Sequence, residues 1–536
     1  MIRDPFREGL AAGWQHIDAS DLTADTRREA DVVIVGSGAG GGVTAEMLAN
    51  AGLQVILVEE GPLRTTGDFR MREADAYPDL YQESAARKTA DKAINILQGR
   101  CVGGSTTVNW TSSFRTPPAT LAHWQAVHGL EPLTVDALAP WFQALERRLN
   151  VRPWDGEPNA NNALLARGAQ ALGIATAIIP RNVARCWNLG YCGMGCPTNA
   201  KQSMLLTAIP AALSKGAVLY SRLRAERLVF SGRRASRLEA AALKPDGLTP
   251  SGVTVSLTAR HFVLAGGAIN TPALLLRSRA PDPHGRLGRR TFLHPTVVSA
   301  ARFRQAVKGF SGAPQTIYSD HFLNQHPIDG PLGFKLEVPP LHPVLYSTTL
   351  PGFGEEHAER MGEFPHVQVI IALVRDGFHP DSPGGQVTLR NDGSPRLDYP
   401  LNATYWEAAR RALLAMAEIQ LAAGAEWVRP VHETARACRT WPEARRAIAE
   451  LPLAPITCRV VSAHVMGGCA MADAPERGVT DHLGRHFQID NLSIHDGSLF
   501  PTSIGANPQL SVYALVARNA AVLATALTGR PKPAIL

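Results

Sequence analysis

The sequence of 536 residues is poor in aromatic side chains (6%). It also lacks any hydrophobic run approaching the ~18 residues that a membrane-spanning helix needs. Its most apolar late segment, residues 511–527, is interrupted by Arg518 and Asn519, which predicts a buried helix. Residues 1–28 contain acids and have no apolar core of a secretory signal. These absences predict a cytoplasmic protein without a transmembrane segment, with export in complex with a signal-bearing partner as the alternative.

Cysteine is scarce, and its number is odd. Seven cysteines cannot all pair, and a chain of this length builds a core without disulfides. The 54 Lys and Arg residues exceed the 47 Asp and Glu residues by 7, but the bases form no long block. We therefore expect no nucleic-acid partner. The sequence shows neither an internal repeat nor a low-complexity linker.

Near the N-terminus, the hydrophobic pattern predicts a strand, a helix and a second strand within about 30 residues. Residues 31–35 (DVVIV) and 54–58 (QVILV) are continuous apolar runs, typical of strands buried on both faces. Residues 41–51 between them have helical spacing. The same reasoning predicts further strands over residues 261–265 and 366–374 and further helices over residues 268–277, 406–423 and 441–451.

A Gly-x-Gly-x-x-Gly pattern at Gly36, Gly38 and Gly41 lies at the turn between the first strand and its helix. Gly36 permits a tight turn, Gly38 lets a pyrophosphate approach the backbone, and Gly41 lets the helix pack against the strand. Free N–H groups at the helix start, beside Ala39, favour a phosphate. Glu59 ends the second strand, where an acid binds ribose hydroxyls and disfavours NADP. The sequence thus predicts a site for NAD or FAD, and its place at the start of a long, interrupted chain favours FAD.

Two further motifs carry a family resemblance. Residues 99–109 contain Gly103, Gly104 and Ser105, which suit a loop laid against a flat ring or a phosphate. Residues 267–276 read GAINTPALLL. With the dinucleotide pattern and the C-terminal motifs described below, they make the chain resemble the glucose–methanol–choline (GMC) oxidoreductases, which are flavoenzymes that oxidise alcohols.

This resemblance implies a fold of the α/β (α+β) class. A Rossmann-like FAD-binding domain is expected over residues 1–115, 201–300 and 455–536. The inserted substrate-binding domain, over residues 116–200 and 301–454, is expected to be built on an antiparallel or mixed β-sheet.

The resemblance also implies which residues bind FAD. Asp496 and Gly497 are expected near the ribityl and pyrophosphate groups, and Pro508 near the edge of the flavin pyrimidine. Asn109 stands where relatives with covalently bound flavin have a histidine, so non-covalent FAD is expected. The full set of expected cofactor-binding residues is Gly36, Gly38, Ala39, Gly41, Glu59, Gly103, Gly104, Ser105, Asn109, Gly266, Asp496, Gly497 and Pro508.

Alcohol oxidation needs a base for the hydroxyl proton while hydride leaves the carbon, and an imidazole suits this because its pKa lies near neutrality. His464 lies in a His-x-x-Gly context, and Asn507 lies before a proline. The resemblance implies that they form the catalytic pair, with His464 as the base and Asn507 positioning the alcohol oxygen. The local sequence alone favours a core histidine, one of 17 in the chain. We interpret His294, which precedes Pro295, as structural.

Three of the cysteines, Cys186, Cys192 and Cys196, lie within eleven residues, and a proline follows the last. Three thiolates in such a run can ligate an iron–sulfur cluster. The spacing is similar to that of the three-iron, four-sulfur site in bacterial glucose dehydrogenases of the same family. Buried thiols, or one disulfide, are the equally weighted alternative, because residues 200–203 also resemble the long-chain alcohol oxidases.

These patterns together predict FAD-dependent oxidation of an alcohol to an aldehyde or ketone. Oxygen, a quinone or a redox partner protein would accept the electrons. Apolar stretches such as residues 336–350 favour a hydrophobic primary alcohol as the small-molecule substrate. The alternatives are a partner-dependent sugar or polyol dehydrogenase with an iron–sulfur cluster, a lyase or photodecarboxylase on the same fold, and a non-catalytic FAD-binding subunit.

Overall fold

The first predicted strand forms the middle of a large sheet in the computed structural model, which describes residues 2–530. The predicted strand–helix–strand unit is confirmed as β2 (Thr26–Val35), α2 (Ala39–Asn50) and β3 (Val55–Val58). β2 and β3 are parallel, with Val32 opposite Val55. The strand begins five residues earlier than predicted, and the helix begins two residues earlier, because Ala39 and Gly40 already have helical conformation.

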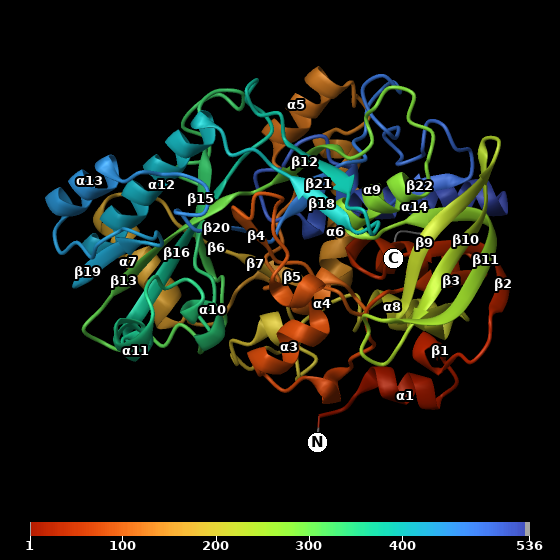
Figure 1. Ribbon diagram of the computed structural model, residues 1–536, viewed down its shortest axis with the longest axis horizontal. Coiled ribbons are helices and arrows are strands. Elements are labelled where there is room, and N and C mark those ends of the chain that lie inside the picture. Colours follow the sequence, from red (N-terminus) through yellow and green to blue (C-terminus); the bar gives the residue numbers. More distant parts are fainter. Residues whose placement is uncertain (1, 531–536) are drawn as a thin grey trace.

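This sheet has eight strands, in the order β1–β8–β3–β2–β11–β10–β9, with β22 also paired to β11 (Figure 1). Strands β1, β8, β3, β2, β11 and β22 run parallel, whereas β10 and β9 form an antiparallel extension. The further bounds are β1 (Gln15–Asp18), β8 (Val218–Ser221), β9 (Leu223–Ser231), β10 (Arg234–Leu243), β11 (Pro250–Leu264) and β22 (Leu492–Ile494).

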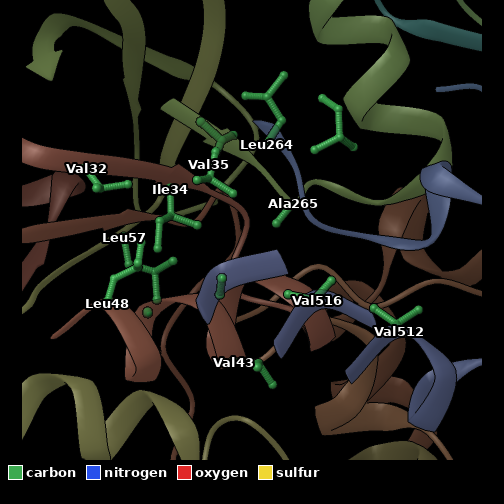
Figure 2. Packing of buried hydrophobic residues seen from close by; sticks show 14 of the residues in the cluster. Val32, Ile34, Val35, Val43, Leu48, Leu57, Leu264, Ala265, Val512 and Val516 are labelled. Atoms are coloured by element: carbon green, nitrogen blue, oxygen red, sulfur yellow. The ribbon is translucent and has the colours of Figure 1, made fainter. Parts of the chain in front are cut away.

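Four helices pack together beside this sheet: α2, α6 (Val135–Arg148), α8 (Ala208–Ser214) and α14 (Gln509–Thr528). Apolar side chains of β2, β3 and β11 form one core with those of α2 and α14, as Figure 2 shows. Within residues 2–530, α14 alone is long and apolar enough to cross a membrane, yet most of its apolar window is buried inside the protein. The burial predicted for residues 511–527 therefore agrees with the structure.

A second eight-stranded sheet lies on the other side of the molecule (Figure 1). Its order is β4–β20–β13–β16–β15–β14–β6, with β19 also paired to β13. Helix α12 (Ala403–Ala422) covers one face together with α7 (Ala160–Ala171). The bounds are β4 (Ile94–Ile96), β6 (Ala177–Ile178), β13 (Thr296–Arg302), β14 (Ile317–Ser319), β15 (Phe334–Glu337), β16 (Val367–Val374), β19 (Trp427–Pro430) and β20 (Val460–Ser462).

Two smaller sheets and the remaining helices complete the fold. The order of the four-stranded sheet is β18–β17–β12–β21, and β5 pairs with β7. The strand bounds are β5 (Val151–Pro153), β7 (Pro180–Asn182), β12 (Arg289–Leu293), β17 (Gly385–Leu389), β18 (Pro395–Asp398) and β21 (Val465–Gly467). The helix bounds are α1 (Pro5–Ala11), α3 (Glu73–Leu80), α4 (Ser105–Val108), α5 (Pro118–His128), α9 (Gly267–Arg277), α10 (Pro343–Ser347), α11 (Gly354–Gly362) and α13 (Trp441–Glu450).

The predicted class, a nucleotide-binding sheet joined to a second, mainly antiparallel sheet, is confirmed. The division into five segments stays a prediction. Strands β4 and β20, from the segments predicted to bind FAD, pair within the second sheet. Helix α6, from a segment predicted for the substrate domain, packs against α14. Residue 1 and residues 531–536, at the two ends of the predicted FAD-binding domain, lie outside the described residues.

Candidate active site

A cavity of about 910 Å³ lies between the two large sheets. One of its walls, here called the glycine wall, consists of the lining residues within 36–40 and 99–109. Another, here called the sheet wall, consists of the lining residues of β13 and β16 together with residues 339–349. His464, Asp496, Gly497, Asn507 and Pro508 also line the cavity. The structure therefore brings most of the predicted site residues to one place.

The three glycines of the dinucleotide pattern have different surroundings. Gly36 has a φ of +99°, and a Cβ there would lie 2.3 Å from the carbonyl oxygen of Ala265. A Cβ at Gly41 would lie 1.8 Å from the Gly36 carbonyl oxygen, so this glycine lets the helix approach the strand. At Gly38 the nearest heavy atom would be the Cα of Gly104, 3.9 Å away. The open cradle is thus at Gly38, where a pyrophosphate is expected, and Gly41 is outside the lining.

Glu59 is buried at the edge of the cavity and braces the glycine wall. Its Oε2 accepts hydrogen bonds from the Ser37 backbone N–H at 3.1 Å and the Ser37 hydroxyl at 2.6 Å. Its Oε1 accepts from the Gly61 N–H at 2.9 Å. Burial nevertheless raises the pKa of Glu59 above its ordinary value. The carboxyl group is held in a fixed orientation, and its lining position suits the expected contact with a ribose.

The second glycine cluster completes this wall. Gly104 and Ser105 line the cavity, whereas Gly103 lies behind them and donates its N–H to the Ser37 hydroxyl at 2.9 Å. Asn109 lines the cavity and donates from Nδ2 to Oε1 of Gln509 at 2.8 Å. An amide at this position cannot form the covalent bond to flavin that a histidine can, so the expectation of non-covalent binding stands as a prediction.

Asp496 closes the cavity at the start of α9. Its Oδ2 accepts from the Gly267 N–H at 2.8 Å and from the Thr271 hydroxyl at 2.6 Å, and its Oδ1 accepts from the Ser498 N–H at 2.8 Å. Gly266 lines the cavity beside Gly267. Since protein groups already satisfy the Asp496 carboxylate, its main effect is to fix the backbone around α9 and Gly497.

His464 and His294 are brought together by two crossings between the same pair of sheets. His294 lies between β12 and β13, and His464 lies between β20 and β21. β12 pairs with β21 in the four-stranded sheet, and β13 pairs with β20 in the second large sheet. The two Nδ1 atoms are 2.9 Å apart, and the rings meet edge to face. His294 is thus a hydrogen-bond partner of His464, a contact that no local sequence signal indicates. Its structural role stays a prediction.

The protonation of this pair follows from its hydrogen bonds. The backbone N–H of Gly505 donates to Nε2 of His294 at 3.1 Å, so a neutral His294 carries its proton on Nδ1. That proton is donated to Nδ1 of His464, and the proton of a neutral His464 then lies on Nε2. In this arrangement His464 offers a hydrogen-bond donor to a ligand. To take a proton on Nε2 it must first exchange tautomer, which breaks the bond between Gly505 and His294.

Burial keeps both imidazoles neutral. It lowers the pKa of His464 to about 4, and the Lys335 cation adds to this effect. Burial and the neighbouring His464 hold the pKa of His294 well below its ordinary value. Although His464 borders the cavity, the unliganded ring is therefore uncharged at neutral pH.

Asn507 has a buried partner that the sequence analysis did not identify. Its Nδ2 donates to Oε2 of Glu337 at 3.2 Å, and Gln315 Nε2 donates to the same oxygen at 2.8 Å. Glu337 is 0% exposed. A charged residue within the run 336–350, which otherwise suggested an apolar surface, is the only sequence signal that could have pointed to it.

The cysteine run is separate from the cavity lining. All three thiols are free, and residues 2–530 contain no group of three His, Cys, Asp or Glu side chains that could hold a metal ion. Cys186 packs beside Trp154, Cys192 receives a weak bond from Arg181 at 3.7 Å, and Cys196 contacts the Thr198 hydroxyl at 3.5 Å. The iron–sulfur alternative is therefore not supported, and free thiols are what the structure shows.

Residues 77–296 and 380–516 match the two sequence descriptions of the family GMC oxidoreductase, together about two thirds of the chain. An uncharacterized GMC-type oxidoreductase of Mycobacterium tuberculosis is 32% identical over 526 residues, which cover 96% of this chain and 80% of that protein. This chain belongs to the GMC oxidoreductase family. The long-chain-alcohol oxidase FAO4A of Arabidopsis thaliana is 28% identical over 504 residues, which cover 91% of this chain and 67% of the relative.

Solved structures of GMC flavoenzymes share the fold. Pyridoxine 4-oxidase from "Mesorbium loti" superposes with a TM-score of 0.66 at 20% identity and covers 91% of this chain and 98% of its own. A formate oxidase variant of Aspergillus oryzae, studied for its FAD modification, superposes with a TM-score of 0.65 at 17% identity and covers 94% and 99%. The protein is thus an oxidoreductase of a family that oxidises alcohols, and FAD is the cofactor that this family implies.

The cavity residues fit FAD. The space beside Gly38 is open, and the N-terminus of the twelve-residue helix α2 points to it. The buried Glu59 lines the cavity where a carboxylate that contacts the ribose is expected. The volume of about 910 Å³ lies at the upper end of ligand pockets, about 300–1,000 Å³, which leaves room for a large ligand.

Proposed function

We propose that this protein oxidises primary alcohols with a hydrophobic chain, using non-covalent FAD as the hydride acceptor. The observation that carries the proposal is the composition of the sheet wall. The apolar residues that line it from β13 and β16 are Val298, Ala300, Val369, Ile371 and Leu373, and Thr296 at the start of β13 is polar. Residues 339–349 add Leu341 and Leu345, with Tyr346 and Thr349 as polar exceptions. None of these side chains is charged, so the wall favours a hydrocarbon chain over a sugar.

The chain's residues hold the two reactants in defined places. The glycine wall, Glu59 and the region of Asp496 and Pro508 would hold FAD, which would supply the hydride acceptor for the alcohol carbon. His464 and Asn507 bind the alcohol oxygen at the point where the glycine wall meets the sheet wall. A hydrocarbon chain bound along the sheet wall would displace water from this point, which strengthens the hydrogen bonds to the developing alkoxide.

His464 has two tasks in this proposal. With its proton on Nε2, it donates to the alcohol oxygen and orients it. With its proton on Nδ1, it can take the hydroxyl proton while hydride leaves the carbon. The His294–Gly505 hydrogen bond favours the first form, so proton transfer requires that His294 release Gly505. Asn507 cannot take a proton at neutral pH, and its role is to position the oxygen.

Molecular oxygen is the electron acceptor that we propose. The named relatives include several long-chain-alcohol oxidases, and the structural neighbours are oxidases as well. A quinone or a redox protein is the alternative. Neither the dehydrogenase with an iron–sulfur cluster nor the lyase has a specific observation in its favour. The cytoplasmic location stays a prediction.

The test is anaerobic reduction of the purified holoenzyme by alcohols of increasing chain length. The reduction is measured as the loss of the absorbance of oxidised flavin. We expect rapid bleaching by long primary alcohols, weak bleaching by short ones and none by glucose. Readmitted air should restore the absorbance and release hydrogen peroxide. If the flavin absorbance stayed unchanged with every alcohol, the proposal would be wrong. If a quinone but not air reoxidised the flavin, the electron acceptor would be a quinone and not oxygen.

A further inference from the structure

Glu337 lies on the face of the second sheet that covers the cavity. Along β15, Phe334 and Leu336 belong to the core shared with α12, so the alternate residues Lys335 and Glu337 point to the opposite face. Glu337 pairs with Ile371 of β16, whose side chain lines the cavity. This carboxyl group therefore lies beside Ile371 on the cavity-side face of the sheet, next to the lining residues but not among them.

The hydrogen bonds of Glu337 are asymmetric. Its Oε2 accepts from Asn507 and from Gln315, whose own Oε1 is held by the Ser112 hydroxyl at 2.7 Å. Within residues 2–530, Oε1 of Glu337 and Oδ1 of Asn507 are both buried without a hydrogen-bond partner. A completed network would not leave a carboxyl oxygen and an amide oxygen bare in the interior. The hydrogen bonding of this pair is therefore incomplete in the arrangement that the structure shows.

The charges around Glu337 come from few groups. Lys335, on the same strand, forms an ion pair with Asp320 at 3.2 Å and lies over the rings of Phe114 and Tyr318. Burial raises the pKa of Glu337 to about 7, against the opposing effects of Lys335 and the Asn507 hydrogen bond, and Asp320 raises it slightly. The neighbours on β16 are apolar, Tyr318 on β14 pairs with Glu337, and the Lys335 cation also acts on His464.

We propose that Glu337 is a positioning residue whose protonation decides which end of the Asn507 amide faces the alcohol oxygen. When ionised, Glu337 accepts one N–H of Asn507 and turns it away from the substrate. When Oε2 is protonated it becomes a donor, and the amide turns so that Oδ1 faces Glu337 and both N–H groups face the cavity. This inference rests on the proposed function, since it takes Asn507 to be a ligand of the alcohol oxygen.

The direction of the effect follows from the charge that develops in the reaction. An alkoxide-like oxygen is stabilised by donors, so the state with both N–H groups available is the faster one. Flavin reduction should therefore slow as the pH rises through about 7. One hydrogen bond of ordinary strength corresponds to a change of about 2- to 10-fold. His464, with a pKa near 4, remains neutral across this range and does not contribute to the break.

The experiment is the pH profile of flavin reduction by a long primary alcohol in the wild type and three variants. In Glu337→Gln the new amide can donate to Asn507 Oδ1, and we expect a flat profile at the fast, low-pH level. In Asp320→Asn the break should move to lower pH, because a negative neighbour of Glu337 is removed. Glu46→Gln is the matched control, because Glu46 is also a buried carboxyl with a raised pKa but pairs with Arg148 away from the cavity.

A second readout does not depend on turnover. Infrared difference spectra of the holoenzyme between about pH 5 and 9 should show a protonated carboxyl band that disappears near neutrality and is absent in Glu337→Gln. An unchanged break in Glu337→Gln, or no such band in the wild type, would overturn the inference. If no alcohol reduces the flavin, the proposed function fails, and the infrared titration still decides the state of Glu337.

Discussion

The glycine wall presents the cavity with backbone N–H groups and bare Cα atoms, whereas the sheet wall presents the branched side chains of β13 and β16. On the first wall, a Cβ at Gly36 would lie 2.3 Å from the carbonyl oxygen of Ala265. At Gly41, just outside the lining, a Cβ would lie 1.8 Å from the carbonyl oxygen of Gly36. On the second wall, the side chains of Ile371 and its lining neighbours form the boundary of the cavity, so their size sets the space that is available. One wall therefore recognises a ligand through its backbone shape, and the other through side-chain volume.

The difference between the walls decides which residues can be recognised in the sequence and which property of the enzyme each residue affects. A glycine that the fold requires can be recognised in the sequence, because no other residue type fits its positive φ or the close approach of neighbouring backbone. An apolar lining residue can be exchanged for another of similar size. We therefore expect substitutions on the glycine wall to act on folding and FAD, and those on the sheet wall to act on the choice of alcohol.

The largest effect is expected for Gly41→Ala. Its Cβ would overlap the Gly36 carbonyl oxygen at 1.8 Å and force α2 away from β2. Such overpacking costs about 3 kcal/mol or more, since backbone must move. Thermal unfolding of the purified protein, and the yield of soluble protein, are the measurements.

Gly38→Val is the matched control for that prediction, because a Cβ there meets only the Gly104 Cα at 3.9 Å. The apoprotein should unfold within about 1 kcal/mol of the wild type, yet the valine should occupy the FAD cradle and the protein should be purified without flavin. If both variants lost only flavin, or both only stability, the distinction between the two glycines would be wrong.

His464→Ala is expected to slow flavin reduction by about 10²- to 10⁴-fold, the usual contribution of a positioned acid–base group. FAD should remain bound, because His464 lies between the walls rather than on the glycine wall. Rapid-mixing measurements of flavin reduction give the rate. His16→Gln is the control, since His16 is also partly buried but bonds to Ser221 outside the cavity lining, and its rate should be unchanged.

The elements that carry the glycine wall could be predicted from the sequence. The apolar runs and the glycine spacing are local, and they predicted the order strand, helix, strand of β2, α2 and β3, although β2 and α2 both begin earlier than predicted. The role of Glu59 at a ribose stays a prediction. The strand predicted over residues 261–265 was too short, because β11 begins at Pro250. Its first part alternates exposed and buried residues and contains Thr, Ser and Arg, so it lacks a continuous apolar run.

The far side of the site could not be predicted in the same way. His294 meets His464 only because four strands cross between two sheets, a contact that spans 170 residues. Glu337 lies in a strand whose four residues are all buried, so no alternation of exposed and buried residues marks the face to which its side chain points. Local sequence encodes a turn or a helix start, but it does not encode which buried polar groups become neighbours.

A smaller effect is expected for Ile371→Trp, which narrows the sheet wall. The KM for a long-chain alcohol should rise about tenfold, the scale set by one or two methylene groups in an apolar pocket, while a short alcohol is little affected. Steady-state kinetics over a series of chain lengths measures the change. Ile371→Val, which enlarges the space, should shift the preference the other way. An equal loss for all chain lengths would remove this wall from substrate selection.

The smallest effect is expected for Cys186→Ser. This variant tests whether the two walls are the only regions on which flavin reduction depends, or whether the cysteine run is a third. The thiol packs in a small cluster with Trp154 and does not line the cavity, and no metal-holding group lies within the described residues. Flavin reduction should stay within about twofold of the wild type, in line with substitutions away from a working site. Iron analysis of the wild-type holoenzyme should find no stoichiometric iron. A stoichiometric iron content per chain that is lost in the variant would contradict this prediction. It would show a third, cluster-binding region beside the two walls and would favour a redox protein as the electron acceptor.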